Sequence, residues 1–173
     1  DSLMAAVRKS KTLPRQNFEF VPDAIVVADT RGNITLVNTQ AESMFGYSRD
    51  ELLGKPLEIL MPARYRENHA QHRARYFSRP TSRPMGAGLE LYARRKDGNE
   101  FPVDIMLNPL ETEDGLFGLS VIRDVSERKR AEEALRRAHE QLELRVQERT
   151  AQLLKAKEEL RLAATVMHDS NDA

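Results

Sequence analysis

The stretch AIVVADTRGNITLVNTQAE, residues 24–42, decides the fold. AIVVAD (24–29) and NITLVN (33–38) are runs rich in β-branched residues, as in strands, and the TRG between them predicts a hairpin. Thr39 then begins the pattern T-x-x-E, which predicts that its hydroxyl caps a short helix. Two strands followed directly by a helix indicate an α+β domain in which helices cover one sheet.

The pattern of short helices continues after this stretch. Gly46 stands where the first helix should end, since glycine favours the C-cap. Ser48 and Glu51 form S-x-x-E, which predicts a capping box for a second short helix. Pro62 suits the first turn of a longer helix that extends to about Ser78.

Three further strands are predicted, at GLELYAR (88–94), FPVDIML (101–107) and LFGLSVI (116–122). KDGNE and EDG separate them as hairpin turns. The order is therefore strand, strand, helices and three strands. A single five-stranded antiparallel sheet with helices on one face would bury this pattern.

The composition excludes several kinds of site. The chain has 173 residues, with 27 Lys and Arg against 27 Asp and Glu, so no basic excess argues for nucleic acid. It has no cysteine, which excludes disulfides, Cys–zinc sites, thiol catalysis and photochemistry through a flavin–cysteine adduct. No phosphate loop, nucleophile elbow or paired-carboxylate pattern occurs, so no catalytic residue and no enzymatic activity of this fragment are predicted.

The compartment is predicted from the same features. Absence of cysteine fits a reducing environment. No apolar run approaches the roughly 18 residues of a membrane span, and no signal peptide is visible. We therefore expect a cytoplasmic location and no direct membrane contact of this fragment.

The distribution of glycine and proline predicts the domain boundaries. All eight glycines and all eight prolines lie between Pro14 and Gly118. We expect a turn-rich domain over 17–125 and a long helix over 126–167. Residues 1–16 would form a flanking segment, with a short helix that packs at a dimer interface.

The helix carries one narrow seam of apolar or small residues with spacings of three and four. A heptad seam of this length predicts a parallel two-stranded coiled coil, and hence a homodimer, rather than a helix packed on its own domain. Paired spacings of four make one stutter, which locally unwinds a supercoil. The seam is Ala131, Leu135, Ala138, Leu142, Val146, Arg149, Leu153, Ala156, Leu160, Ala163 and Met167.

Three stretches of the sequence resemble the PAS domain family. They are PDAIVVADTRGNITLVNTQAESMFGYSRDELLGKP (22–56), ARRKDGNEFPVDIMLNPL (93–110) and GLSVIRDVSERKRAEEAL (118–135). The resemblance implies a five-stranded antiparallel sheet with flanking helices around a small pocket. It also implies a sensory or dimerising module of a bacterial-type signalling protein, such as a two-component system, whose output domain is not in this chain.

The same resemblance implies a signal junction between the last strand and the output helix. It covers Arg123, Asp124, Val125, Ser126 and Glu127. Physical chemistry agrees, because Ser126 can cap a helix and Glu127 suits its positive end.

The longest predicted helix of the domain contains RENHAQHRARY (66–76), with His69 and His72 three residues apart. Met61, Tyr65 and Tyr76 share their helical face, so both histidines should point toward the sheet or the pocket rim.

Three roles remain open for the histidines. Packing of half-buried imidazoles with hydrogen bonds to backbone or tyrosine is favoured, and no cofactor is then needed. A metal site is disfavoured, because zinc requires three or four protein ligands and no suitable carboxylate shares the face. The third role is haem: the helix resembles that of haem-binding, oxygen-sensing PAS domains, with His69 at the iron-ligand position and Ile105 and Leu107 at distal-pocket positions. Leu89 stands where that sub-family has an arginine.

The last residues leave two alternatives for the next domain of the parent protein. MHDSNDA (167–173) resembles FEFVPDA (18–24), so 168–173 would open a second PAS domain. Alternatively, His168 begins the phosphoacceptor box of a histidine kinase. In that case the parent protein would be a histidine kinase. A cyclic-dinucleotide enzyme is the other type of parent protein that we expect.

Overall fold

The computed structural model describes residues 18–86 and 90–169, with side chains up to residue 164. Strands β1 (Ala24–Asp29), β2 (Ile34–Val37), β3 (Arg83–Pro84), β4 (Leu91–Arg94), β5 (Glu100–Thr112) and β6 (Gly115–Asp124) form one sheet. Their order is β2-β1-β6-β5-β3, β4 also pairs with β5, and every pairing is antiparallel. The predicted α+β fold with an antiparallel sheet is thus confirmed.

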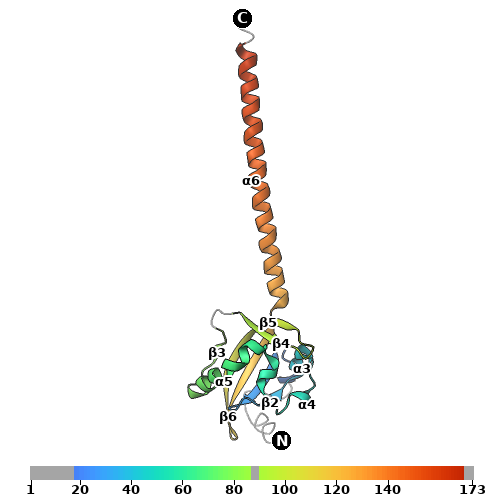
Figure 1. Ribbon diagram of the computed structural model, residues 1–173, viewed down its shortest axis with the longest axis vertical. Helices are drawn as coiled ribbons and strands as arrows, with labels where there is room; N and C mark the ends of the chain where they lie inside the picture. Colours follow the sequence, from blue (N-terminus) through green and yellow to red (C-terminus); the bar gives the residue numbers. More distant parts are fainter. Residues whose placement is uncertain (1–17, 87–89, 170–173) are drawn as a thin grey trace. The chain divides into compact units, whose positions relative to one another are not determined.

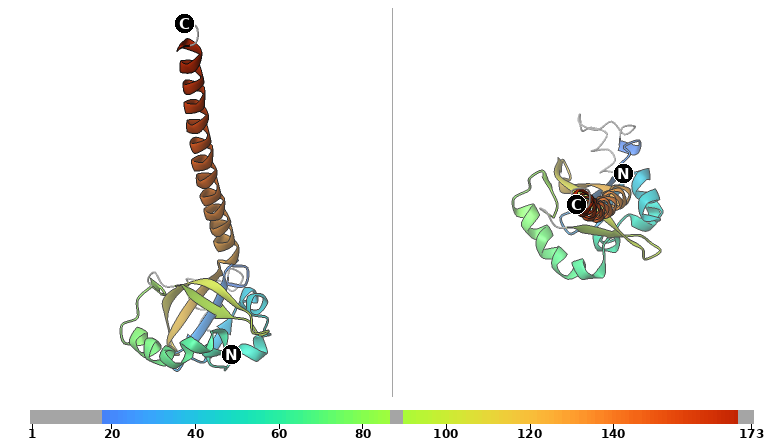
Figure 2. Two further views of the ribbon diagram at one scale, coloured as in Figure 1. Left: turned by 45° about the horizontal axis from the view of Figure 1, so that its top comes forward. Right: turned by 90° about the horizontal axis from the view of Figure 1, so that it is seen from above.

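Four helical segments lie across one face of this sheet (Figure 1), and the turned view of Figure 2 shows them gathered on one side of the strands. They are α3 (Thr39–Phe45), α4 (Arg49–Leu52), the 3₁₀ helix η1 (Leu57–Leu60) and α5 (Ala63–Ser78). Their apolar side chains meet those of the sheet in the main core, where the rings of Phe45 and Phe101 lie 5.9 Å apart. Pro62 directly precedes α5, as expected from the sequence.

The sheet differs from the prediction in the number and length of its strands. It has six strands rather than five, because the two-residue strand β3 pairs with Leu107 and Met106 of β5. Such a short edge strand with a proline carries no recognisable sequence signal. β5 and β6 also extend beyond their predicted ends into a long hairpin, while β4 begins only at Leu91.

Strand β1 is buried on both faces, which explains its unbroken apolar run. Ala24 and Val26 belong to the main core under the helices. Ile25 and Val27 point to the opposite face, where they form a second cluster with Phe18, Leu36 and Phe117.

The cap of α3 lies one residue before the predicted position. Asn38, not Thr39, is the N-cap, and its Oδ1 accepts a hydrogen bond of 3.0 Å from the Ala41 amide. Glu42 does not complete a box with Thr39; it accepts a hydrogen bond from the Arg49 amide instead. The capping box at Ser48 is confirmed, since Glu51 accepts from the Ser48 amide at 3.0 Å.

Asn38 is fully buried and makes four hydrogen bonds with its side chain. Besides the cap of α3, Oδ1 accepts from the Ile25 amide at 2.8 Å. Nδ2 donates to the carbonyls of Asp23 and Phe18 at 3.0 and 3.3 Å. One amide therefore joins the start of β1, the end of β2, the start of α3 and the segment before the sheet.

Helix α6 (Ser126–Asp169) is 44 residues long, or about 66 Å at about 1.5 Å per residue. It forms a separate unit from residue 127 onward. Neither α6 nor any other described helix has the length and apolarity that a membrane crossing requires.

Asn38→Ala should lower the free energy of unfolding by about 3 kcal/mol, because it leaves buried amides and carbonyls without partners. Thr39→Ala should cost less than about 1 kcal/mol, since the Thr39 hydroxyl bonds only to the Glu19 carboxylate in an exposed contact. Urea unfolding of both variants tests this. Equal losses would instead indicate that Thr39 is the effective cap.

Candidate functional site

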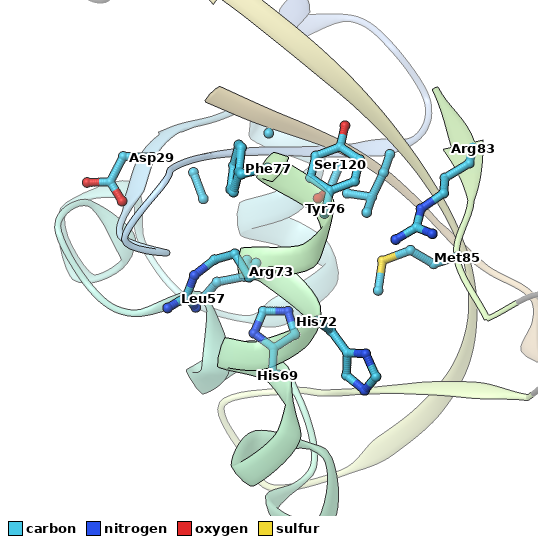
Figure 3. A pocket seen from close by; sticks show the side chains of 13 residues that line it. Asp29, Leu57, His69, His72, Arg73, Tyr76, Phe77, Arg83, Met85 and Ser120 are labelled. Atoms are coloured by element: carbon cyan, nitrogen blue, oxygen red, sulfur yellow. The ribbon is translucent and has the colours of Figure 1, made fainter. Parts of the chain in front are cut away.

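A cavity of about 70 Å³ lies between α5 and the sheet (Figure 3). The side chains of α5 form one wall, and β1, β3, β5 and β6 form the other. Its lining consists of Ala28, Asp29, Leu57, His69, His72, Arg73, Tyr76, Phe77, Arg83, Met85, Leu107, Gly118 and Ser120. About half of these residues are apolar, and the others carry polar or charged groups that could orient a ligand.

His69 is held by a carboxylate that comes from η1. Its Nδ1 lies 2.7 Å from Oε1 of Glu58, and its side chain is only 13% exposed. An ionised carboxylate can only accept, so Nδ1 carries the hydrogen and Nε2 is left without one in the neutral ring. The favoured prediction of a half-buried, hydrogen-bonded imidazole agrees with this geometry, although the partner is a glutamate rather than backbone or tyrosine.

Arg73 binds the same carboxylate. Its Nη1 lies 2.5 Å from Oε1 of Glu58, and it also lies against Gly32 in the β1–β2 turn. Gly32 has a φ of +93°, and a Cβ there would overlap the guanidinium of Arg73. Arg73 is half-buried, and the Glu58 carboxylate compensates its charge there.

The ionisation of Glu58 follows from this pairing. Burial opposes its charge, but hydrogen bonds from His69 and Arg73 outweigh that effect and lower the pKa of Glu58 below its usual 4.5. The carboxylate is therefore ionised near neutral pH and holds η1 against α5.

The other lining residues divide into exposed and buried groups. His72 is exposed at the cavity edge, so both histidines lie at the cavity as predicted. Tyr76 is only 5% exposed, and its hydroxyl has no hydrogen-bond partner within residues 18–86 and 90–164.

Leu107 lines the cavity, whereas Ile105, predicted beside it, packs against the main core instead.

His69 is suited to bind a haem iron, but the volume of the cavity is not suited to a haem. A histidine whose Nδ1–H binds a carboxylate is the usual form of a metal-ligating imidazole. However, about 70 Å³ is far below the roughly 300–1,000 Å³ of sites for drug-sized ligands, so a haem does not fit the cavity as it stands. Among the described residues no group of three or more His, Cys, Asp or Glu could hold a metal ion.

The predicted signal junction lies at the end of β6. The Asp124 carboxylate accepts 2.9 Å from the Ser126 amide and 2.7 Å from Nη2 of Arg95. Asp124, not the Ser126 hydroxyl, thus caps the helix α6. Val125 is buried, and its amide donates to the Pro102 carbonyl.

Arg95 and Arg123 fix the two sides of this junction. Arg95 also donates to the carbonyl of Met44 and lies over the ring of Phe101 at 3.8 Å. Arg123 forms two hydrogen bonds with Asp23, of 2.9 and 2.7 Å, which tie the end of β6 to the segment before β1. Glu127 is exposed in the first turn of α6.

The predicted seam residues all lie in α6. Its large apolar members up to residue 164 are 59–73% exposed in the single chain, namely Leu135, Leu142, Val146, Leu153 and Leu160. Arg149 is also exposed, and Met167 lies beyond the last described side chain. Leu144, Leu154 and Leu162 are exposed off the seam.

Sequence reasoning missed Glu58, Arg73 and Arg95. No spacing rule links Glu58 to His69, because the contact joins two separate helices. For Arg73 a signal existed: it stands four residues after His69, so both reach the same neighbour on one helical face.

Glu58→Gln should lower the free energy of unfolding by about 1–2 kcal/mol at neutral pH, since Arg73 loses its charged partner. The folded pKa of Glu58 is lowered, so its contribution is present above about pH 4.5 and is lost as the pH falls through the folded value. The gap in unfolding free energy between wild type and variant should therefore narrow as the pH falls below about 4.5 and close below the folded pKa. Urea unfolding at several pH values measures it.

Glu100→Gln is the matched control for that experiment. Glu100 pairs with Arg64 at 2.5 Å, but both side chains are more than a third exposed, so the loss should be much smaller than that of Glu58→Gln. A Glu58→Gln effect that stays constant down to about pH 3 would contradict the role of the carboxylate charge.

Comparison with known proteins agrees with this fold. The family model described as PAS domain matches residues 22–127. Sensor protein FixL of Bradyrhizobium diazoefficiens is 32% identical over 151 residues, which are 86% of this chain and 27% of that protein. Cell-division control histidine kinase PdhS of Brucella ovis is 26% identical over 160 residues, 92% of this chain and 15% of that protein.

Two further proteins place the domain in the same family. Oxygen sensor protein DosP of Escherichia coli is 26% identical over 101 residues, 58% of this chain and 13% of that protein. The crystal structure of a PAS domain from Colwellia psychrerythraea superposes with a TM-score of 0.56 at 25% identity, covering 65% of this chain and 93% of that one. The chain spans about a quarter or less of its curated relatives. With the family model matching more than half of its length, this chain belongs to the PAS domain family.

Proposed function

We propose that this chain is the sensor and dimerisation module of a bacterial-type signal-transduction protein, in which strands β5 and β6 pass a change at the cavity to α6. Its relationship to a sensor protein, an oxygen sensor and a histidine kinase supports a sensory role. The observation that carries the proposal is that one strand pair borders both the cavity and the junction. Leu107 and Ser120 face each other across β5 and β6, and both line the cavity.

Asp124 stands four residues after Ser120 on the same strand. Its carboxylate holds both Arg95 and the first amide of α6. A displacement of β6 caused by filling or emptying the cavity therefore changes the point from which α6 begins. The residues 123–127 act as the connection between sheet and helix.

The second part of the proposal is a parallel two-stranded coiled coil. The exposed seam leucines and valine of α6 would be covered by the same residues of a second copy. Such a homodimer places two domains at one end of a shared coil, so that a change in either domain alters the pair of helices that leads to the output.

The domain division proposed for the whole chain follows from these parts. Residues 1–16 flank the sensor domain at 17–125, the coil is 126–167, and 168–173 open the next domain. Residues 1–16 and 170–173 lie outside the described residues, so the roles suggested for them, and for His168 as a phosphoacceptor, rest on the sequence alone. A histidine kinase is the favoured parent, because PdhS aligns with 92% of the chain. A cytoplasmic location is proposed from the composition of the sequence, in particular from its lack of cysteine.

Leu153→Asp combined with Leu160→Asp should convert the dimer into a monomer, since it places two charges per helix in the seam. Leu144→Asp combined with Leu162→Asp changes two leucines of similar exposure off the seam and should leave the dimer intact. Sedimentation velocity distinguishes the two pairs. A monomeric wild type at high concentration, or equal effects of both pairs, would contradict the coiled coil.

Haem-based gas sensing is a second candidate function, because of His69 and the relationship to an oxygen sensor. It would require the cavity to open well beyond about 70 Å³. We expect protein produced with added haem to show no Soret band after purification. A band that His69→Ala abolishes would establish the haem alternative.

A further inference from the structure

Tyr76, which lines the cavity, carries a buried hydrogen-bond donor that the described part of the chain leaves unused. The Tyr76 hydroxyl has no partner in the described part of the chain, although the residue is only 5% exposed. A buried hydroxyl without a partner is costly, so such a group calls for an acceptor. Burial raises the pKa of Tyr76, with an opposing effect of Arg83, so the phenol remains a neutral O–H donor.

A second hydroxyl belongs to the same cavity. Ser120 on β6 is 7% exposed and is one of only two buried polar residues among those described. Its backbone lies directly opposite Leu107, which gives the cavity part of its apolar wall. The Ser120 side chain forms no hydrogen bond with any described residue.

The third group is the guanidinium of Arg83. The pairing of β3 with β5 places Arg83 opposite Leu107, and its Cζ lies 5.6 Å from the centre of the Tyr76 ring. Arg83 is exposed at the cavity mouth and forms no ion pair with any described residue. Its charge is therefore available to a ligand at low cost.

The other charged groups of the lining already have partners. Arg73 is paired with Glu58, and the Asp29 carboxylate accepts from the amide and side chain of Asn33. Figure 3 shows Asp29 on the opposite side of the cavity from Arg83, while Tyr76 lies between them. The half of the cavity near Tyr76 and Arg83 thus offers donors and one uncompensated positive charge.

We propose that the cavity binds a small organic carboxylate, with its oxygens accepting from Tyr76, Ser120 and Arg83. A carboxylate has about four lone-pair sites on two oxygens, enough for two hydroxyls and one guanidinium. Phe77, Met85 and Leu107 would surround a short apolar chain. The small cavity favours a chain of a few carbons. The inference rests on the proposed function only in treating this cavity as the sensory site.

Butyrate is a suitable probe, with butyramide as its uncharged isostere. Titration calorimetry on the whole chain should show saturable binding of butyrate and at least about tenfold weaker binding of butyramide, a ratio set by the charge on the head group. Equal affinities, or no saturable butyrate binding, would overturn the proposal.

Tyr76→Phe removes only the unused hydroxyl. It should weaken butyrate binding at least about tenfold, while the melting temperature without ligand stays the same or rises, because no existing hydrogen bond is lost. A lower melting temperature would show that the hydroxyl has a structural partner, and would overturn its role as a ligand donor.

Arg83→Gln should also weaken butyrate at least about tenfold and make the affinity insensitive to salt. Arg79→Gln is its matched control, an exposed arginine just after α5 that does not line the cavity, and it should bind butyrate normally. Equal losses in both variants would overturn the site.

The sedimentation of the seam variants separates this inference from the proposed function. If the chain is a dimer that does not bind butyrate, the proposed coiled coil stands and the proposed ligand is wrong. If the chain is a monomer that binds butyrate through Tyr76, the coiled coil is wrong and the ligand site stands.

Discussion

The buried amide of Asn38 is the interaction on which the domain depends. It has no water to replace its partners, so its four hydrogen bonds must all be made within the protein. They require β1, β2 and α3 to meet at one point, together with the segment that carries Phe18 and Asp23. Any other register of the first hairpin would leave several polar groups buried without partners. The crossing from sheet to helices is therefore fixed by these bonds.

That crossing determines where the cavity lies. With α3 and η1 set across one face of the sheet, Glu58 is brought to the helix α5. The carboxylate then binds His69 and Arg73 together, and Arg73 in turn lies on Gly32 of the first hairpin. This charge pairing fastens the middle of α5, and Tyr76, three residues after Arg73, borders the same cavity above β5 and β6.

The parts of the fold that sequence predicted are those with local physical causes. Alternation, β-branching and turn residues are local, so the first hairpin, the Ser48 capping box and α5 were predictable. Thr39 matched the pattern of a cap, but the buried bonds of Asn38 to distant carbonyls decide the helix start, and these are tertiary. For the same reason β3, Glu58 and Arg83 could not be assigned, since each acquires its position from a strand or helix far along the chain. His69 was found because helical periodicity alone brings it to the buried face.

The distance between cavity and junction bears on how strong a signal can be. Ser120 and Asp124 are four residues apart, or about 13 Å along β6 at about 3.3 Å per residue. Strands in a close-packed core transmit displacement rather than absorbing it, and Val125 is itself buried beside Pro102. A regulatory coupling of about 1–3 kcal/mol is comparable to one charge-assisted hydrogen bond. Loss or gain of a single bond of Asp124, to Arg95 or to the first amide of α6, is thus of sufficient size to change the preferred arrangement of the two helices in the proposed coiled coil.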